Sequence, residues 1–533
     1  MNRASFNGMR HEREMARFAR TPFNKKNINI SITYLAEHLG HVAYRVGILA
    51  ALRSRVLNGQ AIGVMITASH NPEDDNGIKI VDPMGEMLEG AWETYATDMV
   101  NTPDASLEQF LQRVIATHQV NLKAKSLVFL GWDTRYSPEI LSLSIATSDG
   151  VESMGGKLNS IGLTSTPIIH FLVMCWNTNE EYGRANDAGY YSKLSSAFNH
   201  DEPRKLYIPE ISVDCANGVG ALVLKKMIDF LQELQSNSST NKESLKINLF
   251  NDLCGADFVK VQQKIPIMKK KDGSSLHVIP NARYASVDGD ADRIIYYYVD
   301  DSGIFHLLDG DRIAILVAGY LKELIKKTGI NIQVGLVQTA YANGINSFLL
   351  PNIPVAWTLT GVKHLHHKAK EFDIVLFNSR TDQKANLKKL LVVRDVINET
   401  VGDAIADLLL VEAILYDSDW NIQQWLNLYD DLPNRQLKVS LQDCSVVKTE
   451  GADVKCIAPA GLQQKITLSS NFHDYFRPSG TENFVRIYAE ADSQKNADSL
   501  AAEVAQAVHS LAGSVGNQIL HKICMKHHYI TFT

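Results

Sequence analysis

Residues 63–72 read GVMITASHNP, an apolar run that passes directly into a polar turn. A short apolar run that ends in turn residues is typical of a buried strand. A serine hydroxyl at the end of such a strand is a candidate nucleophile, which singles out Ser69. His70 and, further along, Lys79 can transfer a proton or bring positive charge to a phosphate bound there. A plain surface turn with Asn-Pro punctuation is the alternative explanation of the same residues.

The same order of strand, polar loop and helix recurs along the chain. The strands predicted in this way cover 63–67, 211–214, 284–287, 294–299 and 334–337. A helix is expected after residue 218, because Leu222, Met227 and Phe230 fall near helical spacing. This alternation is typical of α/β units, in which ligands gather at the carboxyl ends of the strands.

The last part of the chain follows a different pattern. Short strands are predicted at 435–439, 445–449, 475–477 and 484–490, followed by a helix over 497–511. Strands that run together before a helix indicate an α+β domain rather than another α/β unit.

Residues 288–293 read DGDADR and lie between two of the predicted strands. Three carboxylates at alternate positions, those of Asp288, Asp290 and Asp292, can supply oxygen ligands to one hard divalent cation. An EF-hand is excluded, because its sixth position would be arginine instead of glycine and its twelfth valine instead of glutamate. We therefore predict a loop that binds one Mg²⁺ per chain.

Residues 477–482 read RPSGTE, again between two predicted strands. Backbone amides around Gly480 can form an anion-binding nest, and Ser479 and Thr481 add hydroxyl donors. Arg477 can bind a phosphate through two parallel hydrogen bonds. We predict phosphate binding here, with a simple hairpin loop as the alternative.

Two further segments carry weaker signals. Residues 358–368 contain three histidines but no carboxylate or cysteine at a usual zinc-ligand spacing, which favours the start of a polar helix. Lys363 and His364 in it are candidates for contacting a sugar phosphate. Residues 131–135, GWDTR, end in an arginine that can orient a substrate or close an interface, and a structural ion pair explains them equally well.

Composition bounds the class of protein and its partners. A chain of 533 residues is too long for one ordinary core and predicts three or four domains. The net charge of −6 leaves no basic surplus for a nucleic-acid backbone, so we expect no nucleic-acid partner. The six cysteines are scattered, which fits a reducing compartment and favours the cytoplasm. No apolar run approaches the length of a membrane span, so we expect no membrane partner. We also expect a monomer or weak oligomer.

Taken together, the serine, aspartate and RPSGTE loops resemble those of the phosphohexomutase family, in the family's order. Longer stretches resemble its phosphoacetylglucosamine mutase branch. These stretches are ITASHNPEDDNGIKIVDPMGEML (66–88), DCANGVGAL (214–222), LCGADFVK (253–260), DGDADRIIYYY (288–298), VQTAYANG (337–344), TGVKHLHHKA (360–369) and LPNRQLKV (432–439).

The resemblance implies a fold of three related α/β domains with mixed sheets, followed by an α+β C-terminal domain, around a central cleft. The expected domains are 1–185 with the phosphoserine loop, 186–300 with the metal-binding loop, 301–415 for sugar recognition and 416–533 for phosphate binding. The third of these looks incomplete.

The resemblance also implies an isomerase that interconverts N-acetylglucosamine 6-phosphate and N-acetylglucosamine 1-phosphate, in UDP-N-acetylglucosamine biosynthesis. A phosphorylated Ser69 would exchange phosphate with the sugar through a bisphosphate intermediate, with a hexose bisphosphate as activator. Mg²⁺ would bind the serine phosphate and the three aspartates, and Arg293 would lie close to the same charges. The RPSGTE loop would hold the phosphate that does not react.

The chain departs from the family pattern where the sugar is recognised. The family's Glu-Ala-Asn-Gly-His-Gly-Thr loop, which contacts sugar hydroxyls, has no match in the residues that follow Ile374. The family's Tyr-Gly-Thr-Ala-Gly-Phe-Arg segment is absent before Ala36, and Leu359 stands where the branch usually has a lysine. A pocket without hydroxyl partners loses affinity and orientation. Two alternatives therefore stay open: a mutase for glucose or mannose phosphate, and a catalytically impaired relative that binds sugar phosphates.

Overall fold

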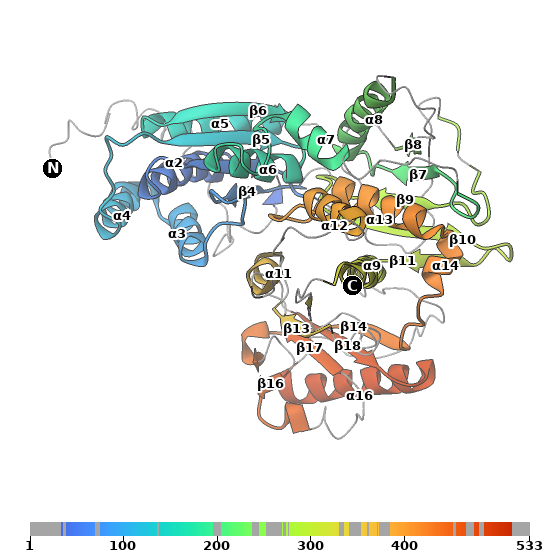
Figure 1. The fold of residues 1–533 in the computed structure, drawn as a ribbon. Helices are drawn as coiled ribbons and strands as arrows, with labels where there is room; N and C mark the ends of the chain where they lie inside the picture. The colour runs from blue at the N-terminus through green and yellow to red at the C-terminus, as the bar shows by residue number, and fades with distance from the viewer. Residues whose placement is uncertain are drawn as a thin grey trace. The chain divides into compact units, whose positions relative to one another are not determined.

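The computed structural model of the chain describes its secondary structure over most of its length. The described residues are 34–35, 39–69, 75–135, 138–195, 204–236, 245–251, 269, 273–275, 277–329, 335–339, 353–359, 362–369, 371, 384–450, 455–464, 474–478 and 484–513. The chain divides into two compact units, both of mixed α and β structure (Figure 1). Unit 1 comprises 1–259, 266–304 and 392–419, and unit 2 comprises 260–265, 305–391 and 420–533.

Unit 1 is built mainly from alternating strands and helices. Its strands are β1 (Tyr34–Leu35), β2 (Ala61–Ile66), β3 (Asp75–Asn76), β4 (Ile78–Val81), β5 (Leu127–Trp132), β6 (Lys157–Leu163), β7 (Glu210–Asp214), β8 (Lys246–Phe250), β9 (Tyr284–Val287) and β10 (Ile294–Val299). Its helices are α2 (Gly40–Val56), α3 (Gly90–Asn101), α4 (Asp104–Thr117), α5 (Pro138–Ser153), α6 (Thr166–Asn177), α7 (Asp187–Ser195), α8 (Gly220–Ser236) and α13 (Ala404–Ser418).

The first sheet of unit 1 places the end of β2 beside the end of β5. Its strand order is β4-β2-β5-β6, with β2 parallel to β5, β5 parallel to β6 and β4 antiparallel to β2. Every residue of β2 is buried, as its unbroken apolar sequence AIGVMI requires. Because Ile66 pairs with Trp132, the polar residues that follow the two strands leave the sheet at the same edge.

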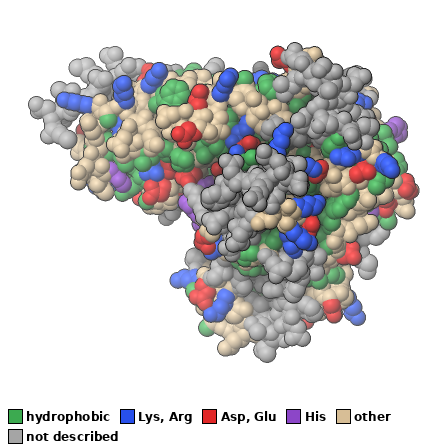
Figure 2. Space-filling model, in the orientation of Figure 1, with side chains coloured by type: hydrophobic (Ala, Val, Ile, Leu, Met, Phe, Trp, Pro, Cys, Tyr) green, Lys and Arg blue, Asp and Glu red, His purple; other side chains and the backbone are tan. Residues whose placement is uncertain are grey.

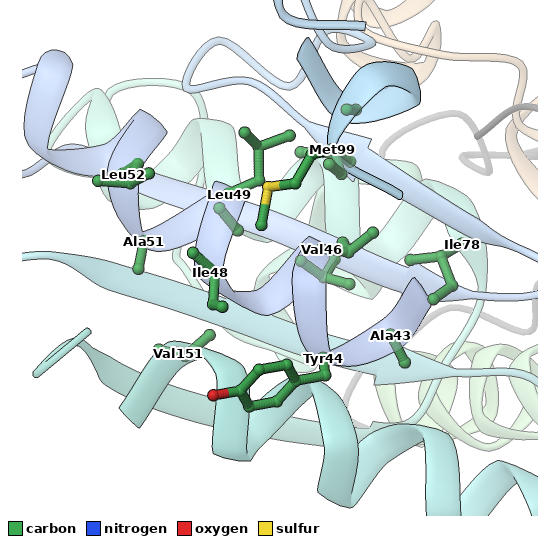
Figure 3. Packing of buried hydrophobic residues seen from close by; sticks show 14 of the residues in the cluster. Ala43, Tyr44, Val46, Ile48, Leu49, Ala51, Leu52, Ile78, Met99 and Val151 are labelled. Carbon is green, nitrogen blue, oxygen red and sulfur yellow. The ribbon is translucent and has the colours of Figure 1, made fainter. Parts of the chain in front are cut away.

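The core of this part of unit 1 forms around α2, which packs against α5. Figure 3 shows side chains of α2, including Val46, Ile48 and Leu49, among buried residues of neighbouring elements. The two helices approach closely at a pair of glycines. A Cβ on Gly47 would lie 2.2 Å from the Thr147 carbonyl oxygen, and one on Gly150 would lie 2.0 Å from that of Tyr44. Any larger residue at either position would push the helices apart.

The second sheet of unit 1 carries the aspartate-rich turn between two of its strands. The strands of unit 1 in it run in the order β10-β9-β7-β8, with β9 and β10 antiparallel and β7 parallel to both of its neighbours. Residues 288–293 connect β9 to β10 as a tight turn. The second sheet is therefore mixed, as the first is.

Unit 2 contains the remaining elements. Its strands are β11 (Phe305–Leu308), β12 (Leu336–Thr339), β13 (Val355–Thr358), β14 (Asn434–Ser440), β15 (Lys448–Glu450), β16 (Lys455–Ala458), β17 (Asp474–Pro478) and β18 (Phe484–Glu490). Its helices are α9 (Gly310–Thr328), α11 (Val362–Ala369), α14 (Ile422–Leu426), the 3-10 helix η3 (Cys444–Val446) and α16 (Gln494–Ala512), and α12 (Lys384–Val396) crosses the boundary between the units. The antiparallel sheet β14-β18-β17 packs against α16 around one apolar cluster.

Most strands and helices predicted from the sequence are present, and one strand begins later than predicted. Residues 445–449 were expected to be extended, but the structure has a 3-10 turn over Cys444–Val446 and β15 begins only at Lys448. The backbone amide of Val447 donates to the Cys444 carbonyl, which closes the turn. The four domain boundaries stay a prediction, because the division into two compact units follows a different criterion. Among the described residues, no helix is long and apolar enough to cross a membrane.

Candidate active site

Ser69 lies in a left-handed turn three residues after the end of β2. Its φ is +52°, a backbone conformation that residues other than glycine adopt at a cost of about 1–3 kcal/mol. The backbone amide of Ser69 donates to Thr67 Oγ1 at 3.0 Å. The turn holds a buried hydroxyl at a fixed position, which suits a nucleophile.

Asp133 and Arg135, which follow the neighbouring strand β5, hold this turn. Arg135 donates to the carbonyl oxygen of Ser69 at 2.9 Å and to that of Asp75 at 2.7 Å. Asp133 accepts hydrogen bonds from Thr67 Oγ1 at 2.7 Å and from Arg135 Nε at 3.3 Å. Burial raises the pKa of Asp133 to about 6, against the opposing effect of Arg135. The structural ion pair that was one interpretation of GWDTR is present between Asp133 and Arg135, and both residues bind the serine turn.

Three carboxylates converge in the turn between β9 and β10. Asp288, Asp290 and Asp292 each offer an oxygen, and these oxygens lie within 4.8 Å of one another. Asp290 is completely buried, and its Oδ1 has no hydrogen-bond partner among the described residues. A buried carboxylate oxygen without a partner is costly, and a bound cation would satisfy it. The donor set is that of a hard divalent ion, so these residues fit Mg²⁺.

The serine hydroxyl lies directly against this carboxylate cluster. Ser69 Oγ donates to Asp288 Oδ2 at 2.7 Å. Arg293 donates to Asp288 Oδ2 at 2.8 Å and to Asp292 Oδ1 at 3.2 Å, and its Nη2 also contacts Ser69 Oγ. Residues more than two hundred positions apart in sequence are thus brought to one point.

Lys79 on β4 supplies the second cation of the cluster. Its Nζ bridges Asp290 Oδ2 at 2.7 Å and Asp292 Oδ2 at 3.0 Å. Because β4 is antiparallel to β2 and Lys79 pairs with Met65, the sheet itself delivers this side chain to the edge where Ser69 lies.

The cluster shifts the pKa values of its members in different directions. Burial raises the pKa of Asp288 well above its usual range, and the nearby Asp292 and Asp290 raise it further. Burial has the same tendency at Asp292, but Lys79 and Arg293 outweigh it and hold its pKa low. Burial lowers the pKa of Lys79, yet its two carboxylate partners outweigh burial and raise it. The two carboxylates therefore favour the protonated, positively charged form of Lys79.

Two residues near the cluster were not singled out from the sequence. Thr166, the first residue of α6, donates from Oγ1 to Asp290 Oδ2 at 2.6 Å. His170, one turn further, is fully buried, contacts the Gly85 carbonyl at 2.7 Å through Nδ1, and has its pKa lowered to about 4 by burial. Ser165 and Pro167 around Thr166 are a helix-start signal, which predicts the helix but not its target.

The remaining predicted residues lie elsewhere or outside the described part. His70, Ser479, Gly480 and Thr481 lie outside the described residues, as do the positions after Ile374 where the sugar loop was sought. Arg477 lies on β17, and nothing is described of its side chain. Lys363 and His364 lie half-buried on α11 of unit 2, in the helix expected there.

The described arrangement has the parts that phosphoryl transfer needs. A hydroxyl nucleophile, an oxygen-ligand set for a divalent cation and two fixed positive side chains meet at one sheet edge. Catalysis of this reaction consists almost entirely of positioning the phosphoryl group and neutralising its charge.

Comparison with known families supports this chemistry along the length of the chain. The matching family models are those of phosphoglucomutase/phosphomannomutase α/β/α domain I (residues 40–107), phosphoacetylglucosamine mutase AMG1 domain II (181–295), AMG1 domain III (309–380 and 375–420) and the phosphoglucomutase/phosphomannomutase C-terminal domain (433–507). The third-domain match comes in two pieces, which meet in the region where the sugar loop is missing.

Two curated relatives of the chain are phosphoacetylglucosamine mutases. The chain is 44% identical to the phosphoacetylglucosamine mutase of Homo sapiens, over 91% of this chain and 93% of that protein. It is 35% identical to that of Saccharomyces cerevisiae, over 90% of this chain and 94% of that protein. The human alignment runs over 531 positions but includes only 91% of this 533-residue chain, so the human protein has residues without a counterpart here.

Solved structures agree with the curated relatives. The N-acetylphosphoglucosamine mutase of Aspergillus fumigatus in complex with GlcNAc-6P and magnesium matches with a TM-score of 0.86 at 36% identity, over 96% of this chain and all of that chain. An N-acetylglucosamine-phosphate mutase of the α-D-phosphohexomutase superfamily, in its substrate complex, matches with a TM-score of 0.83 at 34% identity, over 94% and 99%. The chain therefore belongs to the phosphoacetylglucosamine mutase family and is an isomerase with the mixed α/β fold of the phosphohexomutases.

Proposed function

We propose that this chain interconverts N-acetylglucosamine 6-phosphate and N-acetylglucosamine 1-phosphate through a phosphorylated Ser69. The observation that carries the proposal is the hydroxyl of Ser69 held 2.7 Å from Asp288, inside the carboxylate cluster. The Aspergillus relative in complex with GlcNAc-6P supports the choice of substrate.

Ser69 carries the phosphate between the two sugar oxygens. In the first half-reaction the P–O bond to Ser69 Oγ breaks and Ser69 Oγ takes up a proton, while a P–O bond to the free sugar hydroxyl forms and the proton of that hydroxyl passes to a base. The bisphosphate then returns its other phosphate to Ser69, whose hydroxyl gives up its proton, and the sugar oxygen released takes a proton back. We assign the proton transfers to His70 and the charge neutralisation to Lys79 and Arg293, because Lys79 is held in its protonated form.

Asp288, Asp290 and Asp292 would hold Mg²⁺, with the phosphate on Ser69 as a further ligand. The ion supplies positive charge that neutralises the phosphoryl oxygens during transfer. The magnesium-containing Aspergillus complex supports this ion, and a complex of a serine-to-alanine variant of that relative with glucose 1,6-bisphosphate supports a hexose bisphosphate as activator.

Substrate binding is proposed for residues of unit 2. Arg477, Ser479, Gly480 and Thr481 would bind the phosphate that does not react, and Lys363 and His364 would contact the same sugar phosphate. Their support is the chemistry of the RPSGTE loop, whose amides, hydroxyls and guanidinium suit an oxyanion.

The cellular setting is also part of the proposal. We place the chain in the cytoplasm, in UDP-N-acetylglucosamine biosynthesis, as a monomer or weak oligomer without a nucleic-acid or membrane partner. On the face drawn in Figure 2, acidic and basic side chains are intermixed, unlike the single-signed surface that binds a nucleic-acid backbone.

A second candidate function has one observation in its favour. The sugar-recognition loop expected after Ile374 is missing from the sequence. A protein that keeps phosphate-binding groups but lacks hydroxyl partners could act on glucose or mannose phosphate, or bind sugar phosphates without turnover.

Phosphorus NMR separates these candidates. The purified chain is mixed with N-acetylglucosamine 6-phosphate, Mg²⁺ and a trace of glucose 1,6-bisphosphate, and the 1-phosphate resonance is followed. We expect conversion. Faster conversion of glucose or mannose 6-phosphate would favour the other mutase, and binding without conversion by a folded chain would favour the impaired relative.

The assignment of Ser69 has its own test. Ser69→Ala should abolish both turnover and covalent phosphate detected by intact-mass spectrometry, because Ser69 Oγ contacts both Asp288 and Arg293, whereas the hydroxyl of Thr166 contacts only Asp290 among the described residues. Ser153→Ala, which removes a buried serine hydroxyl on α5, should leave both unchanged. Phosphate that remains attached to the Ser69→Ala protein would show that another residue is the nucleophile.

A further inference from the structure

The turn that carries the three aspartates is hydrogen-bonded to backbone amides at the starts of three different helices. We infer that these helix starts fix the ligand geometry of the metal loop, and that Thr166 is a positioning residue that aims Asp290 at the cation. The inference rests on the proposed Mg²⁺ site, and it adds residues that lie outside the ligand set.

Three successive carbonyl oxygens of the loop accept hydrogen bonds from backbone amides that belong to three separate chain segments. The bonds are Val219 N to Gly289 O at 2.9 Å, Thr166 N to Asp290 O at 3.2 Å, and Ala404 N to Ala291 O at 3.1 Å. Thr166 and Ala404 are the first residues of α6 and α13, and Val219 directly precedes α8. All of these segments belong to unit 1.

These hydrogen bonds stabilise both the helix starts and the loop. The first amides of a helix have no partner within the helix, so the loop carbonyls satisfy donors that would otherwise need water. The N-terminal end of a helix also carries partial positive charge, which offsets the repulsion among clustered carboxylates. Three anchors on three consecutive residues leave the loop backbone little freedom to move when an ion enters or leaves.

Thr166 differs from the other two anchors because it also holds a ligand side chain. Its amide bonds the carbonyl of Asp290, and its Oγ1 donates to Asp290 Oδ2 at 2.6 Å. These two hydrogen bonds from Thr166 fix both the backbone of Asp290 and the rotation of its carboxylate. Thr166 itself is completely buried, so this geometry does not compete with water.

The consequence is that the two oxygens of Asp290 have different surroundings. Oδ2 accepts from Thr166 and from Lys79 at 2.7 Å, whereas Oδ1 is buried without a partner among the described residues. A purely structural carboxylate would gain nothing from this arrangement, because its second oxygen would stay buried without a hydrogen bond, at a cost in folding free energy. With both donors on Oδ2, the free oxygen is the one presented to the ion. Groups behind a ligand that orient it in this way change metal affinity by about 10- to 100-fold when they are removed.

Thr166→Val tests the inference, because valine keeps the branched shape and removes only the hydroxyl. Calorimetric titration of the full chain with Mg²⁺ alone should give a dissociation constant about tenfold or more above that of the unchanged protein. Thr166→Ser restores the hydroxyl and should restore the affinity. Thr147→Val, which removes a buried threonine hydroxyl from a helix carbonyl on α5, is the matched control and should bind Mg²⁺ as the unchanged protein does.

The outcomes separate the inference from the function beneath it. If the unchanged protein binds no Mg²⁺, the proposed metal site is wrong. If it binds Mg²⁺ and Thr166→Val binds equally well, the site stands and the positioning role of Thr166 fails. Weaker binding that Thr166→Ser does not rescue, or that comes with a larger loss of metal-free thermal stability than in Thr147→Val, would also overturn the positioning role. Rescue by serine with unchanged metal-free stability is the expected result.

Discussion

At the scale of single residues, the backbone of Ser69 is held by the side chains of Thr67 and Arg135. Its left-handed backbone is costly on its own and persists because both of its backbone polar groups are bound. Thr67 accepts from its amide, Arg135 donates to its carbonyl, and Asp133 joins these two partners. The proposed nucleophile is therefore held in place by a small buried network.

Arg135→Lys should slow phosphorylation of the chain without preventing it from folding. A lysine has one nitrogen and cannot reproduce the separate bonds from Arg135 to the carbonyls of Ser69 and Asp75. Because a small displacement of a reacting group can cost about 100-fold in rate, we expect a loss of about 10- to 100-fold. The measurement is the rate at which glucose 1,6-bisphosphate phosphorylates the protein, followed by intact mass.

Arg55→Lys is the control for that experiment. Arg55 is also buried and also donates to two carbonyls of unit 1, but these belong to Ala124 and Met154, outside the serine turn. Its replacement should leave the phosphorylation rate within about twofold, as expected for a site away from the reacting groups. Equal losses in the two variants would mean that Arg135 matters only for general stability.

At the scale of elements, sequence reasoning located the serine and aspartate loops and missed the contacts that join them. The strand before Ser69, the strands around the aspartates and the helix that contains Lys363 all follow from local patterns of apolar and turn residues. The pairing of Ile66 with Trp132, which brings the serine turn beside Arg135, depends on contacts across more than sixty residues. The backbone amides of Thr166 and Ala404 are still less visible, because any residue but proline has such a donor. The 3-10 turn at Cys444–Val446 was missed for a related reason, since its single hydrogen bond has no strong sequence signature.

The segment before α13 offers a test of how tightly the metal loop is held. A Cβ on Gly402 would lie 2.7 Å from the backbone carbonyl oxygen of Asp292, so Gly402→Ala must displace either the loop or the start of α13. We expect Mg²⁺ affinity to fall by about tenfold, the size of effect typical of changes just outside a ligand set. Gly319→Ala, where no atom lies within 4 Å of the added Cβ, should leave Mg²⁺ affinity unchanged. Equal Mg²⁺ affinity in both variants, measured by calorimetry, would show that the loop does not need this close approach.

At the scale of the whole molecule, the two units differ in what the sequence could predict for them. The residues of the candidate site that the structure brings into contact, Ser69, Lys79, Arg293 and the three aspartates, all belong to unit 1. Residues 392–419 return to this unit after the chain has passed through unit 2, which no local pattern announces. The groups proposed to bind the substrate, Lys363, His364 and Arg477, belong to unit 2, and their roles stay predictions.

This division leads to a prediction about the missing sugar loop. Insertion of the family's Glu-Ala-Asn-Gly-His-Gly-Thr segment after Ile374 of unit 2 should raise kcat/KM for N-acetylglucosamine 6-phosphate, by about tenfold or more if hydroxyl contacts limit recognition. Mg²⁺ affinity should not change, because every described member of the carboxylate cluster lies in unit 1. A Gly/Ser segment of the same length at the same position controls for loop length alone. Equal gains from both insertions would mean that spacing, not hydroxyl recognition, was limiting, and no gain from either would mean that the chain recognises the sugar with residues of its own.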